Sequence, residues 1–299
     1  MEKAILKTLI YANIFDYPMT VFEIHKWLIG RKAGLRQVES MLVRLSQKAK
    51  VKSQKEYYFL SERDGLVAKR RRREQQSEKY LRKAQVLSSL LQLIPWVKLV
   101  GISGGLAMGN ADKGDDIDLF IITSKNRLWI SRLVMLGLLS LLGQRRKVGE
   151  MGGKIAGKLC INTLLEEDRL EQSSKDIYLA HEVLQMKVLW ERDGIYSKYL
   201  EDNSWAFKFL PNWVAPDTSS PPRVVARGKL RRGSNSKREL FNWIPASAGM
   251  TMERVAKWFQ LKIMKKPQGM ERIGDGALYF HPHDMRSQVL AEFREKVKV

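Results

Sequence analysis

The sequence is poor in cysteine and in acidic residues. Its 299 residues include a single cysteine, Cys160, so no intrachain disulfide can form, a disulfide-stapled scaffold is excluded and a reducing compartment is expected. Only 32 Asp and Glu stand against 53 Lys and Arg, which gives a formal net charge of +21. Hydrophobic residues still make up 44% of the chain, enough for real cores, so a wholly disordered protein is excluded as well.

Long hydrophobic runs are also missing. The most apolar stretch, Leu128–Gly143, contains Arg132, and only 11 residues run without a charge from Leu133 to its end, whereas a membrane-spanning helix needs about 20. A buried helix is therefore predicted there. The N-terminus has no uninterrupted apolar core before a small-residue cleavage site, which indicates no signal peptide. We expect a soluble, cytoplasmic protein with no membrane partner, and the charge favours a polyanion, nucleic acid or nucleotide.

Helical and strand-like periodicities follow one another near the N-terminus. Thr20 stands three residues before Glu23, which is typical of the capping box at the start of a helix. Val38, Leu42 and Leu45 share one face of a later helix. The pattern predicts three helices and then two short strands, over 3–15, 20–28, 35–49, 50–53 and 56–60.

Three helices followed by a small hairpin resemble a winged helix, a variant of the helix-turn-helix. The resemblance implies that Gly34–Lys48 is a recognition helix, which would carry Arg36, Arg44 and Lys48. Two roles remain open for this winged-helix-like module. It reads DNA or, as many winged helices do, it binds proteins or braces a neighbouring domain.

A long helix is predicted over 62–93. It contains five consecutive basic residues, Lys69–Arg73, and five neighbours spread around the whole circumference of a helix, so they cannot form one stripe. The run is interpreted either as part of a solvated connecting helix or as a contact with RNA or DNA phosphates.

Residues 217–251 differ from the rest of the chain. They hold seven basic residues against two acidic ones and sustain no apolar period. Their last ten residues, Asn242–Thr251, resemble a peptide seen where a mobile palindromic repeat of bacterial genomes is read through in frame. We interpret the segment as a disordered basic insertion, with a basic RNA-binding loop as the alternative. The helical pattern resumes at Met252.

The stretch that carries chemistry runs from Val97 to Thr123. Val97–Ile102 predicts a short apolar strand, Ser103-Gly104-Gly105 a tight turn, and Leu106–Gly109 a short helix opening from that turn. After a polar loop, Asp116-Ile117-Asp118 leads into a second apolar strand, Leu119–Ile122.

The spacing of the two aspartates has a physical meaning. Side chains at i and i+2 of a strand point to the same face, so Asp116 and Asp118 would present two carboxylates side by side while Ile117 faces the core. Adjacent carboxylates repel each other unless a cation lies between them, and oxygen ligands suit Mg²⁺. The Gly104-Gly105 turn would offer backbone N–H groups to a phosphate.

These residues together resemble the DNA polymerase β-like nucleotidyltransferase superfamily. Its pattern is an apolar strand, two small residues, about ten further residues and then two acidic residues around an apolar one. The resemblance implies that Gly104 and Gly105, with Ser103 as an additional contact, hold the triphosphate of an NTP, with ATP as the expected one. It also implies that Asp116 and Asp118 are catalytic and bind one or two Mg²⁺, so that a hydroxyl attacks the α-phosphorus and pyrophosphate leaves.

The sequence departs from the family pattern at the third carboxylate, which a later strand usually supplies. The candidate strand is Lys158–Leu165, and its central polar residue is Asn162, a weak neutral Mg²⁺ ligand that cannot act as a base. Either Asn162 occupies the third position and the chemistry is slowed or lost, or the strand register differs and one of the acidic residues 166–168 reaches the site.

Other candidate sites are weaker. His281-Pro282-His283-Asp284 has no cysteine or second histidine cluster to complete a metal site and is expected to cap the last helix. His181 and Glu182 lie in a helical pattern and are interpreted as scaffold, and Cys160 as an inert residue of an apolar strand.

The expected fold class is α+β, with a nucleotidyltransferase core that has a small mixed β-sheet flanked by helices. The expected function is Mg²⁺-dependent transfer of a nucleoside monophosphate to a hydroxyl of a protein, an RNA or a small molecule. The alternative is a DNA-binding regulator whose degenerate transferase domain senses nucleotide. The expected parts are a winged-helix-like module (1–62), a connecting helix (63–94), the transferase core (95–170), a helical region (171–216), the insertion (217–251) and a C-terminal helical region (252–299).

Overall fold

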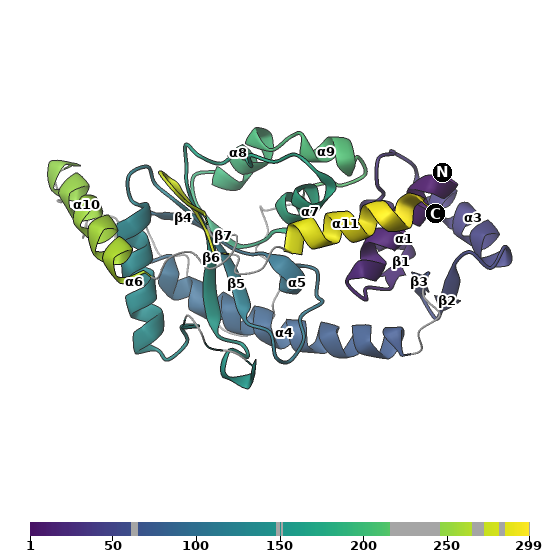
Figure 1. The fold of residues 1–299 in the computed structure, drawn as a ribbon, viewed down its shortest axis with the longest axis horizontal. Helices are drawn as coiled ribbons and strands as arrows, with labels where there is room; N and C mark the ends of the chain where they lie inside the picture. Colours follow the sequence, from purple (N-terminus) through teal and green to yellow (C-terminus); the bar gives the residue numbers. More distant parts are fainter. Residues whose placement is uncertain are drawn as a thin grey trace, which may run out of the picture.

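The computed structural model describes residues 1–60, 65–147, 150, 152–215, 246–264, 272–280 and 285–298. Figure 1 shows an elongated molecule: the N-terminal helices lie at one end, a mixed sheet with its flanking helices lies toward the other, and one long helix runs along both. None of the helices in the described ranges combines the length and the apolar character needed to cross a membrane.

The first 60 residues form three helices and a three-stranded antiparallel sheet; the three helices and the last two strands follow the predicted order, and the strand β1 between the first two helices was not predicted. Thr20 begins the second helix as a capping box, because its hydroxyl accepts the Glu23 N–H and the Glu23 carboxylate accepts the Thr20 N–H. Val38, Leu42 and Leu45 are buried, as predicted. The elements are α1 (Glu2–Ile14), β1 (Met19–Thr20), α2 (Val21–Lys26), α3 (Leu35–Gln47), β2 (Lys52–Gln54) and β3 (Tyr57–Phe59), with strand order β1-β3-β2.

A six-stranded mixed sheet forms the centre of the rest of the chain. Its order is β7-β4-β5-β6-β9-β8; β5 and β6 are parallel, and all the other neighbours are antiparallel. The sheet therefore also uses strands from outside residues 95–170. The strands are β4 (Val97–Ile102), β5 (Ile117–Thr123), β6 (Leu159–Glu166), β7 (Lys187–Glu191), β8 (Arg272–Gly274) and β9 (Ala277–Tyr279).

Alternate residues of β5 enter two different cores. Ile117 and Leu119 pack in the core beneath α4 and α6, whereas Phe120 and Ile122 pack in the core shared with α7, α8 and the N-terminal helices. This α+β arrangement agrees with the fold class expected from the sequence. The flanking helices are α4 (Leu66–Leu91), α5 (Gly104–Ala107), α6 (Leu128–Leu141), α7 (Ile177–Gln185), α8 (Ile195–Asp202) and α9 (Ala206–Phe209), with a 3-10 turn at Gly152–Lys154.

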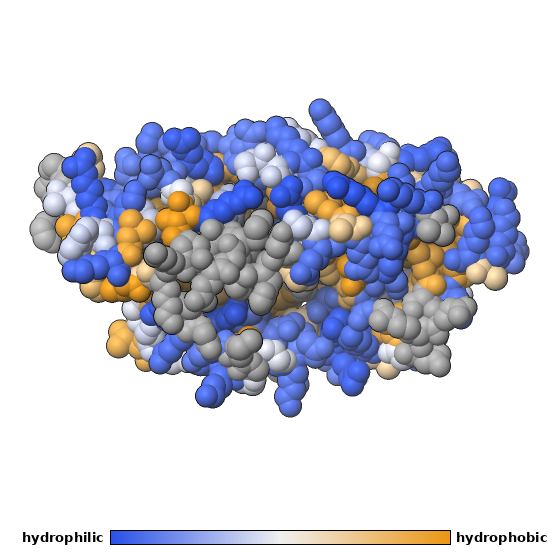
Figure 2. All heavy atoms as spheres, in the orientation of Figure 1, coloured by the Kyte–Doolittle hydropathy of each residue, from blue (hydrophilic) through white to orange (hydrophobic). Residues whose placement is uncertain are grey.

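Two helices complete the described part of the chain. Helix α10 (Ala246–Ile263) packs against α6, and the Glu253 carboxylate accepts the N–H groups of Trp129 and Ile130 at the first turn of α6. It begins six residues before the expected Met252, and Figure 2 shows hydrophobic side chains at the end of the molecule that α10 and α6 form. Helix α11 (Met285–Lys298) returns to pack on α1 and α7 (Figure 1).

Two expectations fall on residues that the structure does not describe. Residues 217–245 of the proposed insertion lie outside the described residues. All four residues of the His281–Asp284 motif lie outside them as well.

Candidate active site

The glycine turn lies at the end of β4, directly against the second strand. Ser103 donates its backbone N–H to the Asp118 carbonyl over 3.1 Å, which joins the turn to β5. Gly104 has a φ of +64°, and a Cβ placed on it would stand 3.1 Å from Asp118 Oδ2. A side chain at this position would be strained and would press on the carboxylate. The turn therefore needs glycine at 104 for two independent reasons.

The two aspartates lie together, as the i, i+2 spacing predicted. Asp118 is the second residue of β5 and Asp116 directly precedes the strand. One donor atom each from Asp116, Asp118 and Cys160 lie within 4.8 Å of one another. Cys160 joins them because β6 runs parallel to β5 with Cys160 paired to Asp118. Cys160 lies in the apolar strand predicted from the sequence, but its place beside the carboxylates was not predicted.

The carboxylates of this cluster repel each other and meet one cation. Arg146 Nη1 lies 2.6 Å from Asp116 Oδ2. Burial and the neighbouring charge of Asp116 raise the pKa of the Asp118 carboxyl well above its ordinary value. Burial, followed by the charges of Asp118 and Asp116, raises the pKa of the Cys160 thiol to about 12. The thiol is therefore protonated at neutral pH and is a poor nucleophile.

Asn162 also faces the site, because it follows Cys160 by two positions and residues i and i+2 of a strand point to the same face. The pairing of β5 with β6 shifts between Leu119–Ile161 and Phe120–Thr163, which leaves Asn162 as the extra residue of a bulge. Its side chain lines the same cavity as Asp118, and Asn162 Oδ1 is buried with no hydrogen-bond partner among the described residues.

The acidic residues 166–168 are at the other end of β6 and have other partners. Glu166 accepts backbone N–H groups from Asn126 and Leu128. Glu167 pairs with Lys98, and Asp168 with Lys125. Of the two alternatives left open by the sequence, the structure agrees with the one that places Asn162 at the site.

Glu182 of α7 is a third carboxylate at the site, and the sequence analysis interpreted it as scaffold. It accepts the backbone N–H of Gly104 and, over 2.6 Å, the side-chain amide of Gln185. Burial raises the pKa of Glu182 to about 7, and its charge in turn raises the pKa of Asp118. The contact joins residues almost 80 positions apart, so no local spacing could predict it.

The donor set fits a divalent metal bound through oxygen. Asp116 and Asp118 supply carboxylate oxygens, and the partnerless Asn162 Oδ1 is a further neutral oxygen on the same side. A cation between the two carboxylates would relieve the repulsion that raises the pKa of Asp118. The protonated Cys160 thiol is a soft group that adds little for Mg²⁺.

Two cavities lie next to the site and share Tyr178 and Glu182 in their linings. The larger has a volume of about 300 Å³ and is lined by Gly104, Gly105 and Asp118 together with residues of α1, β1 and α7 and with Trp27, which directly follows α2. The smaller, about 150 Å³, is lined by residues of β5, β6, α7 and the β8–β9 hairpin.

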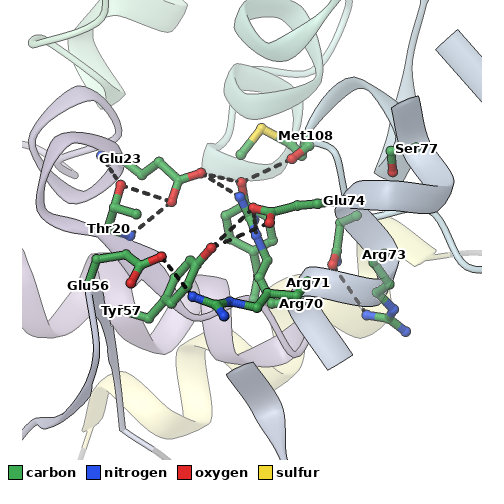
Figure 3. A network of polar contacts seen from close by, with 12 residues as sticks. Thr20, Glu23, Glu56, Tyr57, Arg70, Arg71, Arg73, Glu74, Ser77 and Met108 are labelled. Atoms are coloured by element: carbon green, nitrogen blue, oxygen red, sulfur yellow. Dashed lines mark hydrogen bonds and ion pairs between the residues drawn. The ribbon is translucent and has the colours of Figure 1, made fainter. Parts of the chain in front are cut away.

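The N-terminal helices are held against the core by an ion-pair network (Figure 3). Arg70 of α4 contacts Glu23 Oε1 at 2.8 Å and Glu74 Oε1 at 2.7 Å, and its guanidinium lies over the ring of Tyr17. The Tyr17 hydroxyl donates to the Met108 carbonyl, in the loop that follows the glycine turn. Much of the basic run of α4 is thus used inside the molecule.

Three of the other four members of the run agree with this interpretation, whereas Arg72 is exposed. Lys69 pairs with Asp16, Arg71 with Glu56, and Arg73 with Asp112, so the partners come from both sides of α4. Of the two interpretations open for this run, the structure favours a connecting helix, with the difference that its charges are mostly paired rather than solvated.

A small mixed sheet flanked by helices is consistent with the fold of a nucleotidyltransferase domain. The chain matches the family model of that description, "Nucleotidyltransferase domain", over residues 83–242, which include β4, α5, β5 and β6. Because the match spans more than half of the 299 residues, the chain belongs to this family. No solved structure matches the chain.

Proposed function

We propose that the protein transfers a nucleoside monophosphate from an NTP, with ATP as the first candidate, to a hydroxyl of an acceptor in a Mg²⁺-dependent reaction. The observation that carries the proposal is the contact between the glycine turn and the aspartate pair. Gly104 is packed so closely on Asp118 that a Cβ would reach the carboxylate, and this contact supports a site in which the turn binds phosphate and the aspartates bind metal.

Each residue has a distinct part in this proposal. The backbone N–H groups at Gly104 and Gly105, with Ser103 beside them, would bind the phosphates. Asp116 and Asp118 would hold the metal, which when bound neutralises phosphate charge and orients the acceptor hydroxyl for in-line attack. The acceptor oxygen bonds to the α-phosphorus as it loses its proton, the bond from the α-phosphorus to the bridging oxygen breaks, and pyrophosphate leaves.

Arg146 and Glu182 occupy positions that the substrate would compete for. Arg146 neutralises Asp116, where a metal would bind, and Glu182 accepts the Gly104 N–H, where a phosphate would bind. Both contacts satisfy charged or polar groups in the protein without ligand. We propose that NTP and Mg²⁺ binding displaces them together.

The test is transfer of label from an α-labelled NTP in the presence of Mg²⁺, with protein, RNA and small-molecule acceptors. We expect the double variant Asp116→Asn with Asp118→Asn to lose transfer, whereas Asp202→Asn, an exposed aspartate at the end of α8, retains it. Full transfer by the double variant would show that the site is elsewhere.

A second candidate function is supported by the outer face of α3. Arg31, Arg36 and Arg44 line an open groove there, and none of the three pairs with a carboxylate in the described part of the chain. A winged-helix-like module that binds duplex DNA would place phosphates on this face. Replacing Arg36 and Arg44 by alanine should then reduce the slope of log affinity against log salt by nearly two. This candidate replaces the first if no NTP and no acceptor gives transfer and the protein binds duplex DNA with a steep salt dependence.

We also propose the division of the chain that the sequence suggested, with a winged-helix-like module at 1–62 and the transferase core beginning at about residue 95. The support is the order of helices and strands at the N-terminus and the position of β4.

A further inference from the structure

The larger cavity lies between the N-terminal helices and the glycine turn, and its N-terminal side is aromatic. Tyr11, Phe15, Tyr17 and Trp27 come from the first 27 residues, whereas Gly104, Gly105 and Asp118 line the opposite side. We propose that this cavity holds the nucleobase of the NTP, so that the N-terminal helices form part of the transferase site. The inference rests on the proposed function and adds the substrate group that the N-terminal helices recognise.

The charge distribution favours a neutral, planar group. Among the residues that line the cavity, the carboxylates Asp118 and Glu182 are at the core side. The lining contributed by the first 27 residues has none, because it consists of Thr8, Tyr11, Ala12, Phe15, Tyr17, Met19 and Trp27. Burying a charge against such a wall would be costly, whereas the flat face of a nucleobase stacks on aromatic rings.

A histidine in the wall has an unused hydrogen-bonding atom. His181 of α7 is stacked on Tyr11 with a centroid distance of 4.3 Å and on Trp27 at 5.1 Å. Burial lowers the pKa of His181 to about 3, so the ring is neutral, and its buried Nε2 has no partner among the described residues. The amino, imino and carbonyl groups at the edge of a base are partners of the kind that this atom lacks.

The aromatic wall, formed by Tyr11, Phe15, Tyr17 and Trp27, is held in a fixed position relative to the glycine turn. The Phe15 carbonyl accepts the side-chain amide of Asn110, which follows the glycine turn, and also a guanidinium N–H of Arg73. Tyr17 bonds the Met108 carbonyl over 3.0 Å. A base in the cavity would therefore keep a set distance from the triphosphate.

The size of the cavity favours a nucleoside over a macromolecular acceptor as its ligand. Ligand cavities span roughly 300–1,000 Å³, and a volume of about 300 Å³ is at the lower end of that range. The cavity is continuous with Gly104 and Gly105, where the proposal places the phosphates, so the group attached to those phosphates is the one that enters it.

The experiment compares ligands with and without a base on the full chain. Binding of ATP, GTP, CTP and UTP, and of tripolyphosphate, is measured by calorimetry with Mg²⁺ present for the wild type, Phe15→Ala, Phe15→Leu and Phe22→Ala. Phe15→Leu keeps apolar bulk at a partly buried position and so protects the fold. Phe22 is the matched control, because it belongs to the same N-terminal unit, is 67% exposed and does not line the cavity.

We expect at least one NTP to bind about tenfold or more tightly than tripolyphosphate. Both Phe15 variants should weaken NTP binding at least about fivefold, the lower end for loss of one base–aromatic stack, and leave tripolyphosphate binding unchanged. Phe22→Ala should change neither.

Two results would overturn the inference, and they differ in what else they remove. In the first, NTPs bind and transfer label, but the Phe15 variants bind NTPs as tightly as the wild type or lose affinity for tripolyphosphate by the same factor as for NTPs. The base is then not in this cavity, and the proposed function stands. If the wild type binds neither NTP nor tripolyphosphate, the proposed function and this inference both fail.

Discussion

Glu182 makes the stability of this protein depend on pH in a way that one substitution should remove. Burial raises its pKa from the ordinary 4.5 to about 7, so the folded protein holds this proton more tightly than the unfolded chain. The favourable contribution is complete below pH 4.5 and is lost as the pH rises through 7. At about 1.4 kcal/mol per pH unit, the loss is at most on the order of 3 kcal/mol.

The variant to compare is Glu182→Gln, which has no proton to lose and still offers an oxygen to the Gly104 N–H. Free energies of unfolding are measured by denaturant titration at pH 4 and pH 8, without Mg²⁺. Relative to wild type, the variant should gain on the order of 3 kcal/mol of stability between the two pH values. Glu201→Gln, an exposed residue of α8, is the control and should follow wild type.

The comparison isolates Glu182 because every other titrating group is present in both proteins. A difference between variant and wild type that stays constant from pH 4 to pH 8, within about 0.5 kcal/mol, would show that Glu182 is not held in a protonation-dependent contact. The interpretation that burial raises the pKa of Glu182 in the folded protein would then be wrong.

The remaining predictions concern the site and the long helix. Gly104→Ala should cost at least about 1–2 kcal/mol of stability, because of its left-handed backbone and the pressure on Asp118, and should greatly reduce label transfer; a variant with wild-type melting temperature and transfer would contradict the packing. Mg²⁺ at a hundred times its Kd should stabilise the wild type by about 2.7 kcal/mol and so raise its melting temperature. It should not raise the melting temperature of the double variant Asp116→Asn with Asp118→Asn. Thermal melts with Mg²⁺ and with EDTA measure the difference. Arg70→Met leaves two carboxylates unpaired and should cost about 3–5 kcal/mol in denaturant titrations, whereas the exposed Arg72→Met should change stability by less than about 0.5 kcal/mol.

Local rules predicted much of the framework from the sequence. The capping box at Thr20 begins a helix, Val97–Ile102 is a strand with those bounds, and Ile117 is buried between two aspartates that share a face. Each of these depends on residues fewer than five positions apart, where backbone geometry alone fixes which side chains meet. That Asp116 and Asp118 are catalytic stays a prediction.

The parts that could not be predicted depend on contacts distant in sequence. Glu182 lies on a helix whose apolar residues explain its pattern, and only the packing of α7 against the glycine turn brings its carboxylate to Gly104. The register shift of β6 at Asn162, which sets Thr163 opposite Phe120, depends on the partner strand β5. The two interpretations of the basic run of α4, a connecting helix or a contact with phosphates, likewise could not be separated without its acidic partners from other elements, such as Glu23.

Helix α4 is anchored at both ends of the molecule, so the number of its residues sets the distance and the rotation between those ends. Arg70 and its neighbours fix the helix to the N-terminal unit, while Ser77 accepts the Ala111 N–H and Tyr80 donates to the Lys113 carbonyl on the core side. One residue inserted between Arg73 and Ser77 would turn one half relative to the other by about 100° and lengthen the helix by about 1.5 Å. Insertions of one or two residues should thus separate the aromatic wall from the glycine turn, and sets of seven, close to two full turns, restore the angle but not the distance.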